Sequence, residues 1–283
     1  MRPRHGQTLI VTRPGRWVLR LPRLSRPRLP RLSRPRWRGL AAVAGIAATL
    51  VLALAGAAAP RTVAAPRTRP AGPPRAAARR TSCSSLAHIG DSTSADLISS
   101  ADLPDPAQQL PARYADVGVR HLRIDASGGR SIVETLPGQV NGYNVARAWR
   151  DEGYRGCWVF ALGTNDAANV AVGSSVGMMA RIREMMSVAH GEPVMWVNTV
   201  TQLSSGPYAE ANEQLWDETL LRALAMYPNM RIFDWAAVAQ PSWFLADGIH
   251  YNSAGCAARA QDIAHALARA FPLHGHSRSP IVR

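Results

Sequence analysis

Residues 82–272 predict an α/β domain of three layers, in which helices cover both faces of a doubly wound parallel sheet. Two observations predict this fold. Short apolar runs alternate with longer stretches in which apolar residues recur at helical spacing, which is the pattern of buried parallel strands joined by helices. Hydrophobic residues also make up 47% of the 283 residues, so the chain is able to bury a core and is not wholly disordered.

Five strands are expected in this domain, with helices between them. The apolar runs place the strands at 86–89, 121–125, 158–162, 194–198 and 231–234. Amphipathic spacing predicts helices at 175–190 and 207–227, and Asn252 with Ser253 predicts the N-terminal cap of a last helix. Residues 273–283 are expected to form a flexible tail.

The net charge of +14 belongs to the leader rather than to the domain. All 33 basic residues are Arg, and 18 of them lie at or before position 80, in a stretch without Asp or Glu. Residues 91–283 hold the other 15 Arg and all 19 acidic residues, which leaves a small negative charge. The charge pattern therefore argues against nucleic-acid binding by the folded part.

Residues 40–59 are an uninterrupted run of apolar or small side chains, long enough as a helix to cross a membrane. Twelve Arg precede this run and six follow it before residue 81, a bias that places the N-terminus in the cytoplasm and the domain outside. The run is also compatible with a cleaved signal peptide, because Ala55-Gly56-Ala57 offers a cleavage site. A retained single-pass anchor and a cleaved signal both export the domain.

The rest of the leader is expected to lack regular structure. Residues 1–39 are rich in Arg and Pro and contain LPRLSRPR twice, at 21–28 and 29–36. This composition predicts a disordered cytoplasmic tail against anionic lipid, or alternatively an arm that binds nucleic acid or a partner. Residues 60–81 combine Ala, Pro, Arg and Thr and predict an extended linker that holds the domain off the membrane.

Polar motifs stand where the first three strands end, and a fourth motif precedes the last helix. They are Gly90-Asp91-Ser92, Gly128-Gly129, Gly163-Thr164-Asn165-Asp166 and Asp247-Gly248-Ile249-His250. Each motif alone is more often a turn or a cap than a catalytic element. Catalytic groups in an open parallel sheet gather at the carboxyl ends of the strands, so together the motifs predict one site.

In this order the four motifs resemble the serine, glycine, asparagine and acid–histidine blocks of the SGNH (GDSL-like) hydrolases. The resemblance covers about 83–271 and implies a flavodoxin-like fold and acyl-transfer chemistry without a cofactor. The sequence departs from the family after Ser92, where Thr93-Ser94 replaces a large apolar residue. The exclusive use of Arg and the abundance of Ala suggest an actinobacterial type of source.

The resemblance implies a catalytic triad of Ser92, His250 and Asp247. Ser92 is the expected nucleophile, and it needs a base because a hydroxyl is a weak nucleophile at its own pKa. His250 is the expected base. Asp247, three residues earlier, is expected to hold the imidazole in the tautomer that accepts the serine proton.

The same resemblance implies an oxyanion hole. Its donors are the backbone N–H of Ser92, the backbone N–H of Gly128 or Gly129, and the side-chain amide of Asn165. The sequence leaves open which of the two glycines donates. Asp91 and Asp166 are expected to be structural, since short acidic side chains tie such loops to backbone N–H groups.

Three further features lie near the expected site or compete with it. Arg130 and His88 are candidates to bind a polar or anionic group of the substrate, with packing or surface roles as the alternative. Residues 173–177 match the G-x-S-x-G elbow of α/β-hydrolases, with Ser175 at its centre. No convincing strand precedes them, so we expect them to cap the following helix.

Three cysteines in an exported domain allow one disulfide and one free thiol. Cys83 and Cys157 each precede an expected strand, and they share one edge of the sheet if these strands are neighbours, as in flavodoxin-like order. We therefore expect them to pair, and Cys256 to be a buried free thiol. No spacing of Cys and His indicates a zinc site, so no metal is expected.

The leader predicts export, and the resemblance implies a serine esterase, so together they imply an extracytoplasmic serine esterase. The resemblance to envelope-associated members, some fused to membrane acyltransferases, implies O-acyl esters (for example O-acetyl) of cell-envelope polysaccharide, peptidoglycan or glycolipid as substrates. An O-acyltransferase using the same site and a non-catalytic carbohydrate-binding module are the alternatives. Expected partners are the ester-bearing glycan or glycolipid, the membrane through the N-terminal helix, and a membrane acyltransferase, but not nucleic acid.

Overall fold

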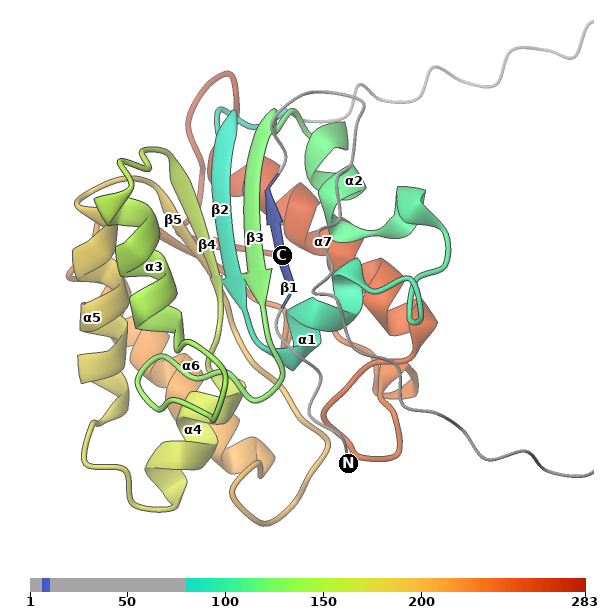
Figure 1. Ribbon diagram of the computed structural model, residues 1–283, viewed down its shortest axis with the longest axis vertical. Coiled ribbons are helices and arrows are strands. Elements are labelled where there is room, and N and C mark those ends of the chain that lie inside the picture. Colours follow the sequence, from blue (N-terminus) through green and yellow to red (C-terminus); the bar gives the residue numbers. More distant parts are fainter. Residues whose placement is uncertain (1–6, 11–79) are drawn as a thin grey trace, which may run out of the picture. The chain divides into compact units, whose positions relative to one another are not determined.

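A single sheet with helices on both faces organises the protein (Figure 1). The computed structural model describes residues 7–10 and 80–283. The strands lie in the order β1-β3-β2-β4-β5-β6-β7; β2 to β7 are parallel, and β1 is antiparallel to β3. Their bounds are β1 (Gln7–Ile10), β2 (Ser85–Gly90), β3 (His121–Ala126), β4 (Cys157–Ala161), β5 (Val194–Val197), β6 (Met230–Phe233) and β7 (Ile281–Val282).

The five strands expected from the sequence are β2 to β6, each within one residue of its expected bounds. Their lateral order, β3-β2-β4-β5-β6, is the order of flavodoxin-like doubly wound sheets. The α/β class is therefore confirmed for the described residues.

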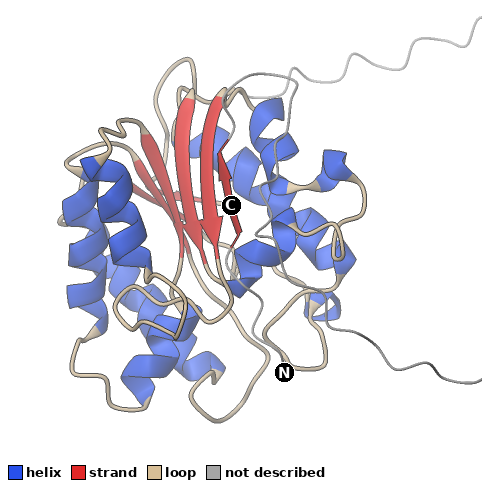
Figure 2. Ribbon diagram, in the orientation of Figure 1, coloured by secondary structure: helices blue, strands red, loops and turns tan. Residues whose placement is uncertain are grey.

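Two sets of helices enclose the sheet (Figure 2). On one face lie α1 (Ser92–Ala95), α2 (Leu110–Asp116) and α7 (Ser253–Ala270), and on the other lie α3 (Gly142–Asp151), α4 (Thr164–Ala171), α5 (Met178–Ala189) and α6 (Glu210–Leu224). Because successive strand residues point to opposite faces, Leu86 and Val159 join one core while Ala87 and Trp158 join the other.

The expected helix at 175–190 is α5, and the one at 207–227 is α6. The last expected helix is α7, which Asn252 caps by accepting a hydrogen bond from the N–H of Gly255 at 3.0 Å. This cap confirms the sequence signal at Asn252.

The expectation of a flexible C-terminal tail at 273–283 is wrong for its last residues, which form β7. The tail's carbonyls accept hydrogen bonds from the N–H groups of Ile232 and Asp234, each at 2.9 Å. Val282 is buried, and Arg283 Nε lies 2.9 Å from Asp234 Oδ2. The outer edge of β6 needs acceptors for its N–H groups, a requirement that the composition of the tail does not display.

Residues 7–10 differ from the disordered tail expected at 1–39, because they pair with the outer edge of β3 as β1. That edge also needs hydrogen-bond partners, and Thr, Leu and Ile at 8–10 suit a strand. Thr81, expected in the linker, is buried and bonds to the carbonyl of Phe271 at 2.8 Å.

The remaining expectations for the leader fall on residues outside the described ones. These are the tail apart from 7–10, the apolar run at 40–59 and the linker up to residue 79. Among the residues that the structure describes, no helix is both long enough and apolar enough to span a membrane.

Cys83 and Cys157, the pair expected from the sequence, form a disulfide. The bond ties the segment before β2 to the first residue of β4, its neighbour in the sheet, across a sequence separation of 74 residues. Cys256 is free and buried.

Replacing both cysteines by Cys83→Ala and Cys157→Ala should lower the free energy of unfolding by about 2–4 kcal/mol, because the unfolded chain regains the entropy of an open loop. Urea denaturation measures this loss. A reductant should destabilise the wild type by a similar amount and leave the double variant unchanged. Equal stability of the two oxidised proteins would contradict the prediction.

Two carboxyl groups of α6, one turn apart, have unusual environments. Glu213 is fully buried, and its burial, with a smaller contribution from the charge of Asp217, raises its pKa to about 9. Burial also raises the pKa of Asp217 to about 8. The folded state therefore keeps protons that the unfolded chain has already released at neutral pH.

The free energy of unfolding should therefore fall as the pH rises from about 4.5 toward 9, the two ends of the Glu213 shift. The slope from this group is at most about 1.4 kcal/mol per pH unit. Glu213→Gln should reduce this dependence of the unfolding free energy on pH, measured by urea denaturation between about pH 5 and pH 9. Glu218→Gln, at an exposed position of the same helix, is the matched control, and equal slopes in all three proteins would refute this account.

Candidate active site

Loops from separate parts of the chain meet at the carboxyl end of the sheet (Figure 1). Ser92, at the start of α1 just after β2, contacts His250 in the loop before α7. The start of α4 contacts the loop after β3 through Asn165 and Arg130. All four motifs singled out in the sequence are therefore at one end of the sheet.

Ser92 is the first residue of α1 and lies on a tight turn directly after β2. The buried carboxylate of Asp91 caps the turn, because its Oδ1 accepts from the N–H of Thr93 at 2.9 Å and from its hydroxyl at 2.8 Å. A Cβ at Gly90 would lie 2.3 Å from Ser94 Oγ, so only glycine fits there. Asp91 is structural, as the sequence predicts.

Ser92, His250 and Asp247 form a continuous chain of hydrogen bonds. Ser92 Oγ lies 2.8 Å from His250 Nε2, across 158 residues of sequence. His250 Nδ1 lies 2.8 Å from Asp247 Oδ2. The side chains of His250 and Asp247 are 33% and 37% exposed, so the chain is open to solvent and to a ligand.

The loop before α7 sets the charge of Asp247. Partial burial raises the pKa of Asp247, but hydrogen bonds from the backbone N–H groups of His250 and Ile249, and from the His250 ring, outweigh it and lower that pKa below its usual value. An ionised carboxylate only accepts hydrogen bonds, so Nδ1 of His250 carries the proton. In this tautomer Nε2 is the acceptor for the Ser92 hydroxyl.

The backbone N–H groups expected to form the oxyanion hole are not used in hydrogen bonds within the described residues. Among the hydrogen bonds of the described residues, none uses the N–H of Ser92, Gly128 or Gly129 as donor. The amide of Asn165 donates from Nδ2 to the carbonyl of Arg130 at 3.0 Å. This bond uses one of its two N–H groups, which leaves the other for a ligand.

The two adjacent glycines differ in their need for glycine. Gly129 has φ +71°, and a Cβ there would lie 2.7 Å from Leu136 Cδ1. A Cβ at Gly128 would meet nothing within 4 Å. The turn therefore requires glycine at 129 for its backbone conformation, whereas Gly128 borders open space.

Tyr208, in the loop between β5 and α6, was not expected from the sequence. Its hydroxyl lies 3.2 Å from Asn165 Oδ1, and a phenol hydroxyl that donates to this oxygen fixes which way the amide faces. Asn165 Nδ2 is thereby held toward the glycine loop. A single tyrosine in a loop carries no sequence signal for this role.

Arg259 of α7 is a second unexpected residue, buried behind the turn that carries Ser92. Its Nη2 donates to Thr93 Oγ1 at 3.3 Å, and its guanidinium carbon lies 4.9 Å from the ring centre of Trp235 and 5.4 Å from that of Tyr251. Burial raises the pKa of Asp91, and the charge of Arg259 opposes this shift. Arg259 therefore supports the turn electrostatically from the core side.

Of the two roles that the sequence leaves open for His88 and Arg130, the structure favours packing, because both side chains are buried. His88 is fully buried between Tyr114 and Ser94, at 2.9 and 3.0 Å, and burial lowers its pKa to about 3, so it is neutral. Arg130 is 4% exposed, and its guanidinium binds the carboxylate and the carbonyl of Asp125 at 2.7 and 2.8 Å. Closeness in sequence to the site does not reveal that both side chains point inward.

The G-x-S-x-G stretch at 173–177 is not a nucleophile elbow. The element directly before it is the helix α4 rather than a strand, and α5 begins after it at Met178. Ser174 donates to Glu134 Oε1 at 2.7 Å and accepts from Arg181 at 2.7 Å. The stretch caps α5 as expected, because its last residue, Gly177, is the N-cap, although no side chain makes a capping hydrogen bond there.

The site thus brings together a hydroxyl, an imidazole, a carboxylate and several N–H donors. This set is able to activate Ser92 for attack on a carbonyl carbon and to stabilise the resulting oxyanion. Within the described part of the chain, no three His, Cys, Asp or Glu side chains are grouped as a metal site.

Known structures similar to this chain include enzymes that act on acyl groups. The lipase/acylhydrolase from Enterococcus faecalis is 15% identical, covers 68% of this chain and 100% of its own, and has a TM-score of 0.49. The C-terminal catalytic domain of Streptococcus pneumoniae peptidoglycan O-acetyltransferase A is 15% identical, with 64% and 89% covered and a TM-score of 0.46. A carbohydrate acetylesterase family member from Sinorhizobium meliloti is 16% identical, with 64% and 95% covered and a TM-score of 0.47.

No protein-family model and no curated protein matches the sequence. At the identities and TM-scores of the similar structures, the likeness supports no argument about activity. The geometry of the site has to carry that argument.

Proposed function

We propose that the domain is an extracytoplasmic serine esterase that hydrolyses O-acyl esters, such as O-acetyl esters, of cell-envelope polysaccharide or glycolipid. The hydrogen-bonded chain from Asp247 through His250 to Ser92 carries the proposal. Each of its two bonds is 2.8 Å long, and it ends on a serine at the start of a helix. A structural serine has no need of an aligned base and a carboxylate behind it.

Acylation follows from this chain. Ser92 Oγ attacks the ester carbonyl carbon while its proton passes to His250 Nε2, and Asp247 stabilises the imidazolium that forms. The oxygen of the tetrahedral intermediate accepts from the N–H groups of Ser92 and the glycine loop and from Asn165 Nδ2. The intermediate collapses when His250 protonates the sugar oxygen, which leaves as an alcohol and leaves the acyl group on Ser92.

Deacylation repeats these steps with water. His250 takes a proton from a water molecule, whose oxygen attacks the acyl-enzyme carbonyl, and the same donors stabilise the second oxyanion. Collapse returns the proton to Ser92 and releases the carboxylic acid. A sugar hydroxyl in place of the water would make the same site an O-acyltransferase.

Two features support a location outside the cytoplasm. The Cys83–Cys157 disulfide is typical of oxidising compartments. The apolar run at 40–59, flanked by Arg, is typical of an export signal or anchor. A domain tethered in this way would meet envelope esters.

Ser92→Ala should abolish hydrolysis of a short-chain aryl ester by the purified chain, with a loss of roughly 10⁴- to 10⁶-fold in kcat. It should also abolish covalent labelling by a fluorophosphonate, because the nucleophile is absent. Ser175→Ala, at the exposed serine of the G-x-S-x-G stretch, is the matched control and should keep both. Retained hydrolysis in Ser92→Ala would overturn the assignment.

The alternatives give different results in the same assay. A transferase would form an acylated product when a soluble oligosaccharide is added, and would hydrolyse the aryl ester slowly without it. A carbohydrate-binding module would show neither turnover nor labelling of Ser92. That last result would reject an esterase and a transferase together.

Asn165→Ala should lower kcat by roughly 10² to 10³ with little change in KM, since its bond to the oxyanion forms in the transition state. Tyr208→Phe should lower kcat about fivefold, the value of one hydrogen bond. In the Asn165→Ala background Tyr208→Phe should have no further effect, because Tyr208 acts through that amide. Additive losses would contradict this; Tyr227→Phe, which precedes β6 at the other end of the sheet, is the control.

A further inference from the structure

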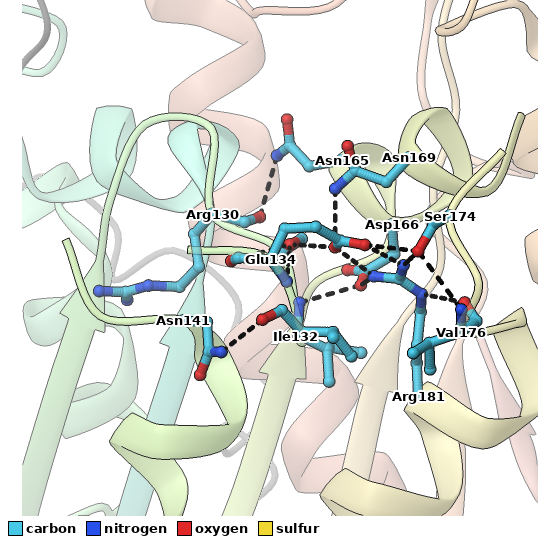
Figure 3. A network of polar contacts seen from close by, with 12 residues as sticks. Arg130, Ile132, Glu134, Asn141, Asn165, Asp166, Asn169, Ser174, Val176 and Arg181 are labelled. Atoms are coloured by element: carbon cyan, nitrogen blue, oxygen red, sulfur yellow. Dashed lines mark hydrogen bonds and ion pairs between the residues drawn. The ribbon is translucent and has the colours of Figure 1, made fainter. Parts of the chain in front are cut away.

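Arg181 of α5 is fully buried, and every one of its N–H groups has an acceptor (Figure 3). Nε donates to the carbonyl of Val176 at 2.9 Å. Nη1 and Nη2 each donate to one carboxylate oxygen of Glu134. Nη1 also donates to Asp166 Oδ1 at 2.8 Å, and Nη2 to Ser174 Oγ at 2.7 Å. Five donors in a planar fork are satisfied at once, which only arginine provides.

One partner of Arg181 leads directly to the proposed oxyanion hole. Asp166 follows Asn165 on α4, and its Oδ1 also accepts from the backbone N–H of Ile132 at 2.9 Å. Asn165 itself holds the carbonyl of Arg130 at 3.0 Å. Two adjacent residues of α4 therefore hold the loop after β3 at two points, just beyond its glycines.

The other partner, Glu134, belongs to that same loop. Its carboxylate accepts from Ser131 Oγ at 2.8 Å within the loop, and from Asn169 Nδ2 of α4 at 2.9 Å. Glu134 Oε1, which accepts from Arg181, also accepts from the hydroxyl of Ser174 in the segment before α5. Figure 3 shows these groups converging on the guanidinium from the loop, from α4 and from α5.

Stability alone is a weak reason for this cluster. A buried ion pair is often no more stabilising than apolar side chains of the same size. Asp166 is fully buried as well, its Oδ2 has no hydrogen-bond partner among the described residues, and burial raises its pKa to about 7. These charged groups are thus buried beside the site at a cost in desolvation. Other inward positions of α5, such as Ile182 and Met185, are apolar.

We propose that Arg181 is a positioning residue of the oxyanion hole: together with Glu134 and Asp166 it fixes the glycine loop at 128–129 against the Asn165 amide. Arg181 touches no substrate. Its catalytic consequence rests on the proposed function, because donors that are placed in advance stabilise an oxyanion without reorganising during the reaction. Its structural consequence, a fixed loop, does not depend on that function.

The structural part is tested first, on the full-length chain, by amide hydrogen exchange. Arg181→Met and Arg181→Lys should speed exchange at Ile132, whose N–H is held by Asp166, and in the loop around it. Arg150→Met is the matched control, because it removes a half-buried pair with Glu192, 3.1 Å apart, near the amino ends of the strands. It should leave exchange at Ile132 as in the wild type.

The catalytic part is tested by steady-state kinetics per folded molecule, with the folded fraction taken from circular dichroism. Arg181→Met should lower kcat roughly 10- to 100-fold with KM nearly unchanged, as expected when oxyanion donors are misplaced by about 1 Å. Binding of an alkyl boronic acid, which mimics the tetrahedral state, should weaken in parallel. Arg181→Lys should recover part of the loss, and Arg150→Met should keep its kcat.

If Arg181→Met fails to fold, Glu134→Gln replaces it, since this side chain is 35% exposed and keeps its shape. Unchanged exchange at Ile132 would overturn the inference whether or not the protein hydrolyses esters. A kcat per folded molecule equal to that of the wild type would reduce Arg181 to a structural residue and also overturn it. Absence of wild-type turnover and of Ser92 labelling would reject the proposed function instead, and the exchange result would still decide the role of Arg181 in the loop.

Discussion

The pairing of β2 with its two neighbours is the constraint on which the site depends. Gly90, the last residue of β2, lies opposite Ala126 of β3 and Ala161 of β4, so three parallel strands end level with one another. The loops that follow therefore leave the sheet side by side. Parallel register is set by rows of backbone hydrogen bonds and by the side chains buried on both faces. A slip of one residue in β2 would move Ser92 away from both other loops.

Much of this arrangement could be predicted from the sequence, and what could not be predicted has identifiable causes. Strands β2 to β6 are buried on both faces, so continuous apolar runs in the sequence predict them. The edge strands β1 and β7 form because neighbouring edges need partners, which no local pattern reports. Likewise, motif residues such as Ser92 and Asn165 stand out at strand ends, whereas Tyr208 and Arg181 act from distant segments through contacts that only the folded chain creates.

The inward-facing polar residues around the site share one physical logic. His88, Arg130 and Arg259 are all buried. Each bonds a residue within two positions of Ser92, in α1 or at the end of β2. Such polar groups lose their hydrogen bonds to water when they are buried. Hydrogen bonds within the protein have to replace them, and these form in only one geometry. They therefore make each loop conformation specific, which apolar packing alone achieves less sharply.

The last strand, β7, has a consequence for how molecules of this protein meet one another. Its two residues occupy the outer edge of β6, where Ile232 and Phe233 pair with Ile281 and Val282. A chain shortened to residue 278 would present that edge bare. An uncovered parallel edge is a template for intermolecular strand addition, and β7 replaces that edge with one of only two residues.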